Sequence, residues 1–180
     1  MGCRAAMIIA VLFAPLAMAQ NADRIKSESN AVTTIGQRNP ALYEGAQALL
    51  AGHDEEGIRL TLQGLEMAQG RREEEAALSN LCAGYIRLKQ YDTALMYCEM
   101  LLARNENSWR GYNNRAVIYI QTRQYEKADQ DLTRGEQLNP GAHTLKVARA
   151  LYMDAVHPVT PEVEIDDRQG ARKADGDEKL

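Results

Sequence analysis

The sequence predicts an all-α protein: a solenoid of about three antiparallel helix hairpins followed by a C-terminal capping helix. Three observations lead to this class. The middle of the chain repeats itself every 34 residues. Aromatic residues make up only 6% of the chain, so the core is built from Leu, Ala, Ile and Tyr, a composition that favours helices. A length of 180 residues suits one domain with a sizeable core.

Residues 1–19 have the layout of a secretory signal peptide. Arg4 supplies one positive charge, an apolar run follows over residues 5–16, and small residues precede a cut at Gln20. The run is shorter than the roughly 20 apolar residues of a membrane anchor. We therefore expect export to the periplasm, or secretion, of a mature chain without a membrane span. Cleavage removes Arg4 and changes the net charge from −4 to −5.

The repeat is clearest between two neighbouring units. A shift of 34 residues places Asn80 on Asn114 and Tyr85 on Tyr119. A third, weaker copy lies upstream at a shift of 37, with Gly45 at one of its small positions. One hairpin cannot cover its own apolar face, so we expect the units to stack. The 34-residue shift also aligns these identical pairs: Ile86 with Ile120, Gln90 with Gln124, Tyr91 with Tyr125, Ala94 with Ala128, and Asn105 with Asn139.

The first unit, residues 40–70, carries recognisable helix ends. Asn39 precedes a proline and is expected to cap the first helix, which stops at Gly52 in a left-handed conformation. Asp54 is expected to cap the partner helix, and Gly70 to end it.

The second and third units, residues 74–107 and 108–141, each contain two helices. A last helix over residues 143–154 has no partner after it and is expected to cap the stack. The paired helices of these two units are expected at residues 73–89, 92–104, 108–122 and 125–137.

The third unit resembles a tetratricopeptide repeat (TPR). It matches the family pattern at Ala116, Tyr119, Tyr125, Ala128, Leu132 and Pro140. The second unit matches through Leu81, Tyr85, Tyr91 and Ala94. The resemblance spans residues 40–154 and implies a right-handed solenoid of an exported bacterial type that acts as a scaffold for protein binding.

In this family the first helix of each hairpin lines a concave groove. Asn80 and Asn114, one repeat apart, can offer their amides to the backbone of an extended peptide. Ile86 and Ile120 would then form an apolar floor. The alternative is that the asparagines bond neighbouring repeats and the isoleucines pack between helices. The resemblance assigns these residues to the groove: Asn80, Ala83, Ile86, Arg87, Arg110, Asn113, Asn114, Val117, Ile120 and Gln121.

One TPR subfamily binds the carboxylate end of chaperone tails with a clamp of two asparagines, lysine and arginine. Only Asn114 matches that clamp, so the sequence excludes this mode of binding. The remaining clamp positions hold Ser79, Ala83, Thr144 and Ala148.

Trp109 opens the third unit beside Arg110 and Tyr112. If these three side chains are exposed, they would form a hot spot for binding a partner protein. The alternative is that Trp109 staples the turn between repeats.

Cys82 and Cys98 are the cysteines of the expected mature chain, since Cys3 leaves with the signal peptide. An even pair in an oxidising compartment is a candidate disulfide. Helices that approach at small residues bring the two Cα atoms toward the roughly 4.4–6.8 Å that such a bond needs. The alternative is two buried thiols that act as small apolar residues.

The sequence contains no catalytic or phosphate-binding motif and no cluster of metal ligands, so neither enzymatic activity nor a cofactor is expected. The net charge of −4 disfavours a nucleic-acid partner. The polar segment of residues 20–39 is expected to be loose or locally helical, and the tail of residues 155–180 disordered.

These observations favour a non-enzymatic adaptor of the cell envelope that binds a protein segment in its concave groove. The alternative is a structural subunit of an envelope or outer-membrane assembly, which would self-associate through the edges of its solenoid.

Overall fold

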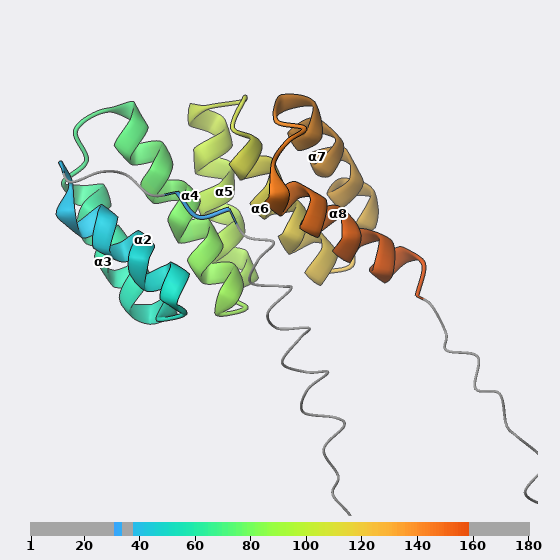
Figure 1. The fold of residues 1–180 in the computed structure, drawn as a ribbon, viewed down its shortest axis with the longest axis horizontal. Coiled ribbons are helices and arrows are strands. Elements are labelled where there is room, and N and C mark those ends of the chain that lie inside the picture. Colours follow the sequence, from blue (N-terminus) through green and yellow to red (C-terminus); the bar gives the residue numbers. More distant parts are fainter. Residues whose placement is uncertain (1–30, 34–37, 159–180) are drawn as a thin grey trace, which may run out of the picture.

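The computed structural model describes residues 31–33 and 38–158 and shows a row of antiparallel helices (Figure 1). Within these residues there are helices and no strand, so the predicted all-α class is confirmed. The predicted signal peptide and most of the predicted tail lie outside the described residues. The helices are α2 (Pro40–Ala51), α3 (Asp54–Glu66), α4 (Arg71–Arg87), α5 (Tyr91–Arg104), α6 (Trp109–Gln121), α7 (Tyr125–Leu138) and α8 (His143–Val156).

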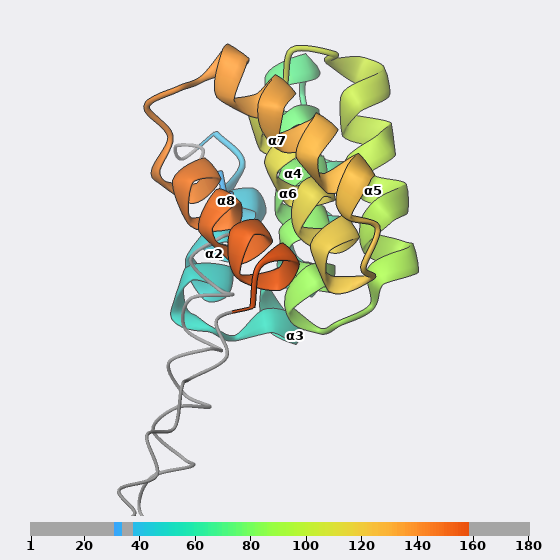
Figure 2. The same ribbon diagram turned by 90° about the vertical axis from the view of Figure 1, so that its right-hand side faces the viewer.

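The helices form an inner and an outer layer. The pairs α2–α3, α4–α5 and α6–α7 pack as hairpins, and each hairpin packs on the next through α3–α4 and α5–α6. The first helices of the hairpins also contact one another, α2 with α4, α4 with α6, and α6 with α8. In Figure 2, α4 and α6 lie between α8 on the left and α5 on the right. The inner layer therefore consists of α2, α4, α6 and α8.

The ends of the first helices follow the predicted signals in part. The Asn39 side chain accepts a hydrogen bond from the Leu42 N–H at 3.1 Å, as an N-cap does, and Gly52 ends α2 with a φ of 86°. The predicted cap at Asp54 is wrong. Asp54 is the first residue of α3, and its carboxylate accepts a hydrogen bond from Arg87 Nε at 2.5 Å.

The predicted end of α3 at Gly70 is also wrong, because the helix already stops at Glu66. Gly70, with a φ of 103°, precedes α4 instead. The left-handed conformation that favours glycine thus leads into a helix here rather than out of one. The other helices begin and end within two residues of the predicted positions.

The two helices of the first hairpin approach closely at glycines. A Cβ on Gly45 would lie 2.6 Å from Thr61 Oγ1 and 3.0 Å from the Gly57 carbonyl oxygen. A Cβ on Gly57 would lie 2.9 Å from the backbone nitrogen of Leu49. The glycines at the small positions of this unit are therefore a steric requirement of the helix crossing.

A disulfide between Cys82 and Cys98 joins the helices of the second hairpin, with Cα atoms 5.4 Å apart. Both residues are fully buried in the core cluster that also contains Ala94. Beside this cluster the rings of Tyr85 and Tyr97 stack with centroids 5.5 Å apart. Close helix approach at a small residue thus brings the two cysteines together.

Helix α8 covers the open side of the last hairpin. Leu145 is buried against α7, where a Cβ on Gly135 would lie 2.7 Å from Leu145 Cδ2. Arg149 adds an ion pair to Glu136 of α7 at 2.9 Å. The helix continues to Val156, so the first two residues of the predicted disordered tail are helical.

Deletion of residues 143–180 is expected to lower the melting temperature, because it exposes the apolar side of α6 and α7 that α8 covers. Thermal unfolding followed by circular dichroism measures the effect. Deletion of residues 159–180 alone is the matched control and is expected to leave the melting temperature unchanged. Equal melting of the two truncated chains would contradict a capping role for α8.

Unfolded without reductant, the mature protein is expected to show no free thiol. The bond between Cys82 and Cys98 closes a loop of about 15 residues and is expected to contribute about 3 kcal/mol to the free energy of unfolding, mainly by restricting the unfolded chain. Reductant should therefore destabilise the natural protein and leave the C82A/C98A double variant unaffected. Two thiols counted in the unreduced monomer would refute the bond.

Candidate functional site

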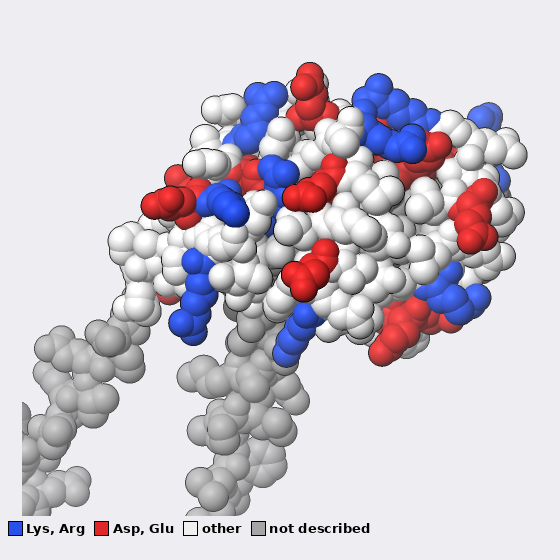
Figure 3. Space-filling view, turned by 180° about the vertical axis from the view of Figure 1, so that it is seen from behind, with Lys and Arg blue, Asp and Glu red and all other residues white. Residues whose placement is uncertain are grey.

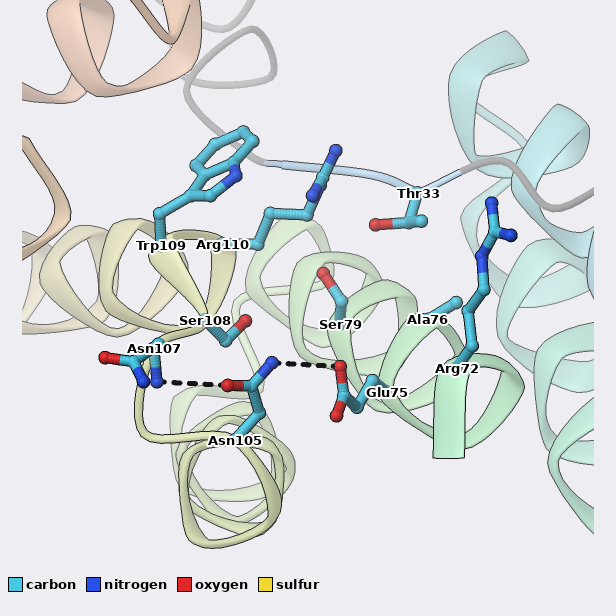
Figure 4. A pocket seen from close by; sticks show the side chains of 10 residues that line it. All are labelled: Thr33, Arg72, Glu75, Ala76, Ser79, Asn105, Asn107, Ser108, Trp109 and Arg110. Atoms are coloured by element: carbon cyan, nitrogen blue, oxygen red, sulfur yellow. Dashed lines mark hydrogen bonds between the residues drawn. The ribbon is translucent and has the colours of Figure 1, made fainter. Parts of the chain in front are cut away.

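Residues 31–33 lie across the inner layer of helices. This short segment passes over α6 and α4 with its backbone toward the helices (Figure 4). The segment falls within residues 20–39, so the expectation of a loose polar segment is wrong for these three residues. Their position along α4 and α6 marks the concave side of the stack as the candidate site.

Two asparagines hold the backbone of this segment. Asn114 Oδ1 accepts a hydrogen bond from the Ala31 N–H at 2.8 Å, and Asn114 Nδ2 donates to the Ala31 carbonyl at 3.4 Å. Asn80 Oδ1 accepts from the Thr33 N–H at 2.6 Å, and Asn80 Nδ2 donates to the Thr33 carbonyl at 2.8 Å. In an extended chain, every second residue faces the same way. The amides of Asn114 and Asn80, one repeat apart, can therefore bind Ala31 and Thr33, two residues apart.

Further hydrogen bonds fix the orientation of these groups. Ser79 Oγ donates to the Ala31 carbonyl at 3.1 Å. Asn114 Nδ2 also donates to the Ser79 carbonyl at 3.3 Å, and Asn113 Nδ2 donates to Asn114 Oδ1 at 3.1 Å. Asn114 therefore binds both an extended segment and the backbone of the neighbouring repeat, the two roles that the sequence left as alternatives.

The side chains of the segment differ in their surroundings. Ala31 is 3% exposed, so a larger side chain has little room there. Val32 packs against the apolar cluster that includes Leu49 and Ile58. Thr33 is half-buried and lines a hollow described below. The groove therefore combines recognition of the backbone with a small position and an apolar one.

Most other residues assigned to the groove serve packing. Ile86 and Ile120 are each 6% exposed and belong to the core cluster, so they form no open apolar floor. Ala83 and Val117 are also buried. Arg87 lies at the end of α4 and pairs with Asp54, outside the contacts to the segment. Gln121, the last residue of α6, is half-buried and makes no hydrogen bond to residues 31–33.

A hollow of about 320 Å³ lies beside the segment, between the first turns of α4 and α6 (Figure 4). The Arg110 guanidinium lies 4.3 Å from the centre of the Trp109 ring. Trp109 is half-buried and packs against the core cluster, which favours its interpretation as a staple of the turn. The residues used below that line the hollow are Thr33, Arg72, Glu75, Ser79, Trp109 and Arg110.

The charges around the hollow are unequally compensated. Glu75 accepts from Arg71 Nε at 2.6 Å and from Asn105 Nδ2 at 3.0 Å. Neither Arg72 nor Arg110 forms an ion pair with a residue that the structure describes. Burial lowers the pKa of the Arg110 guanidinium from its usual value, because desolvation disfavours the charged form. The hollow therefore has a positive rim.

The face opposite to that of Figure 1 carries positive and negative side chains interspersed (Figure 3). No group of three or more metal-binding side chains occurs in the described ranges, 31–33 and 38–158. None of the helices described is long and apolar enough to cross a membrane.

The sequence analysis missed the segment and the hollow. Nothing in the pattern of residues 31–33 marks them as a groove-bound segment, since their contacts to Asn80 and Asn114 are 47 and 83 residues away. The sequence places Arg72 in the polar connection between the first two units, and only the stacking of α4 beside α6 brings it to the hollow with Arg110. The spacing of the asparagines was the one signal that the sequence offered.

No family model and no curated protein matches the sequence. Solved structures do match. The first TPR domain of human RPAP3 has 20% identity and a TM-score of 0.56, over 64% of this chain and 89% of that one. The first TPR of Spaghetti (RPAP3), bound to the HSP90 peptide SRMEEVD, has 21% identity and a TM-score of 0.53, over 67% of this chain and 98% of that one. The Arabidopsis OM64 TPR domain has 16% identity and a TM-score of 0.52, over 73% of this chain and 94% of that one.

These similarities show the fold. The chain is a helical-repeat protein with the tetratricopeptide-repeat fold, as the signature positions of its second and third units predict. The carboxylate clamp for chaperone tails is not formed in this chain. Its lysine and asparagine positions in the inner layer hold Ser79 and Ala83.

Replacement of both groove asparagines, Asn80→Ala with Asn114→Ala, is expected to release residues 31–33. Four hydrogen bonds to the segment are lost, each contributing about 1 kcal/mol. Hydrogen exchange at the Ala31 and Thr33 amides should become faster while the helices stay protected. Asn107→Ala, at an exposed asparagine of the hollow, is the control. Global unfolding of the double variant would mean that the asparagines hold the repeats together instead.

Proposed function

We propose that this protein is a non-enzymatic interaction module that binds an extended segment of a partner protein in its concave groove. The observation that carries the proposal is the pair of amides on the backbone of residues 31–33. A side-chain amide that both donates to and accepts from one residue recognises main chain rather than a particular side chain. The same contacts are available to any extended segment that takes the place of residues 31–33.

Binding of this kind is an exchange. The groove asparagines are fully buried, and a buried amide without a partner costs about 1–3 kcal/mol. A partner segment must therefore displace residues 31–33 and restore the hydrogen bonds that they make. One structural neighbour, the first TPR of Spaghetti, is bound to a peptide, which supports a peptide partner for this fold.

The proposed location is the bacterial cell envelope. The signal-peptide layout of residues 1–19 supports export. The disulfide between Cys82 and Cys98 supports it independently, because such bonds persist in oxidising compartments and are rare in the cytosol. An adaptor that joins envelope proteins is the role that fits both observations.

The alternative is a structural subunit that self-associates. Exposed large apolar side chains in the first hairpin favour it, since Leu50 is 61% and Met67 52% exposed. Crosslinking in intact cells with mass spectrometry separates the two: a ladder of this chain alone supports the assembly subunit, and a crosslinked second protein supports the adaptor.

A peptide with the sequence of residues 27–37 is expected to bind in trans when the protein's own segment is released. The double variant Ala31→Pro with Thr33→Pro, made in the mature chain, removes the two N–H groups that donate hydrogen bonds to Asn114 and Asn80. Fluorescence anisotropy of the labelled peptide measures binding. The natural chain should bind more weakly, because its tethered segment competes at an effective concentration of about 1 mM.

Two further measurements make this experiment decisive. Adding Asn80→Ala and Asn114→Ala to the released variant should abolish binding of the peptide. A released variant that keeps its circular dichroism spectrum and still fails to bind the peptide would refute the groove as a binding site.

A further inference from the structure

We propose that the hollow beside Thr33 is a subsite for an acidic side chain, so that the preferred partner carries Asp or Glu where this chain has Thr33. This inference rests on the proposed function and names the chemistry of the segment that the groove prefers. It assigns a role to Arg72 and Arg110, which form no hydrogen bond to the backbone of residues 31–33.

Thr33 lines the hollow and is poorly matched to it. Its side chain lies between the guanidinium groups of Arg110 and Arg72 (Figure 4). Its hydroxyl oxygen is buried and has no hydrogen-bond partner among the described residues. A buried hydroxyl without a partner loses its hydration without compensation, so Thr33 is a poor match to this polar hollow.

Two arginines, Arg72 and Arg110, line the hollow. Arg110 is held against Trp109 at 4.3 Å, and stacking on an aromatic ring leaves the edge of a guanidinium free to bind a carboxylate. Arg72 lies on the other side of Thr33 (Figure 4). The carboxylate of Glu75 is already engaged by Arg71 and Asn105, so it does not neutralise these two arginines. Among the described residues, neither the half-buried Arg110 nor the exposed Arg72 of the hollow has an ion-pair partner.

The backbone of the segment directs the side chain at position 33 toward the hollow. Residues 31 and 33 face the same way along the extended segment, and Asn80 fixes the Thr33 backbone by two hydrogen bonds. A longer side chain at this position is therefore directed into the hollow, which has a volume of about 320 Å³. A carboxylate there meets both arginines, and charge-assisted hydrogen bonds are roughly twice as strong as neutral ones.

The arrangement explains how a partner displaces a segment that is tethered. Residues 31–33 satisfy the asparagines but place a hydroxyl between two cations. An acidic segment makes the same backbone bonds and adds the pairing with Arg72 and Arg110. These arginines differ from the positions of the chaperone-tail clamp, which the sequence fills with Ser79, Ala83, Thr144 and Ala148.

A test within the mature chain compares Thr33→Glu with Thr33→Gln, which has the same shape without the charge. T33E is expected to slow hydrogen exchange at residues 31–33 by about tenfold relative to T33Q, the scale of one charge-assisted hydrogen bond. The difference should vanish with Arg110→Gln and persist with Lys146→Gln, which removes an exposed cation of α8. Equal protection in T33E and T33Q would overturn the subsite.

A test in trans uses the released variant, Ala31→Pro with Thr33→Pro, and two peptides of residues 27–37 that carry Glu or Gln at position 33. About tenfold tighter binding of the Glu peptide, reduced by salt and lost with Arg110→Gln, supports the subsite. Equal binding of both peptides overturns it and leaves the proposed function standing. Failure of both to bind the folded variant overturns the proposed function together with the subsite.

Discussion

A two-helix hairpin buries only one side of itself, and the rest of this structure depends on that constraint. The apolar side that each hairpin leaves open is covered by the next one, so α4 packs on α3 and α6 on α5. Stacking aligns the first helices of the hairpins side by side, which creates the inner layer. Close approach within each hairpin depends on small residues, glycines in the first and Ala94 beside the disulfide in the second.

The inner layer contains polar groups that cannot be left without partners. Asn80 and Asn114 are fully buried, and each is satisfied by the backbone of residues 31–33. The same hydrogen bonds therefore satisfy the inner layer and hold residues 31–33 in place. Under the proposed function, the backbone of a partner segment would make the same hydrogen bonds in place of residues 31–33.

The arginines that the structure describes fall into two groups, those that form partly buried ion pairs and those that do not. Arg87 pairs with Asp54, and Arg115 with Asp131 at 2.7 Å, and these partly buried pairs join elements of the stack. Arg72 and Arg110 have no such partner among the described residues. Arg110 is half-buried and Arg72 is exposed, and both lie beside the groove-bound segment, where we propose that they bind an acidic side chain of a partner.

The sequence by itself determined the period of 34 residues, nearly all helix boundaries and the spacing of Asn80 and Asn114, because these depend on local patterns that recur along the chain. It did not distinguish the asparagines from Ile86 and Ile120, which it also assigned to the groove but which lie in the core. Only the tertiary structure decided that, and only it brought residues 31–33 into the groove. Those contacts join residues up to 83 apart, and a short polar segment carries no periodic signal for a distant partner.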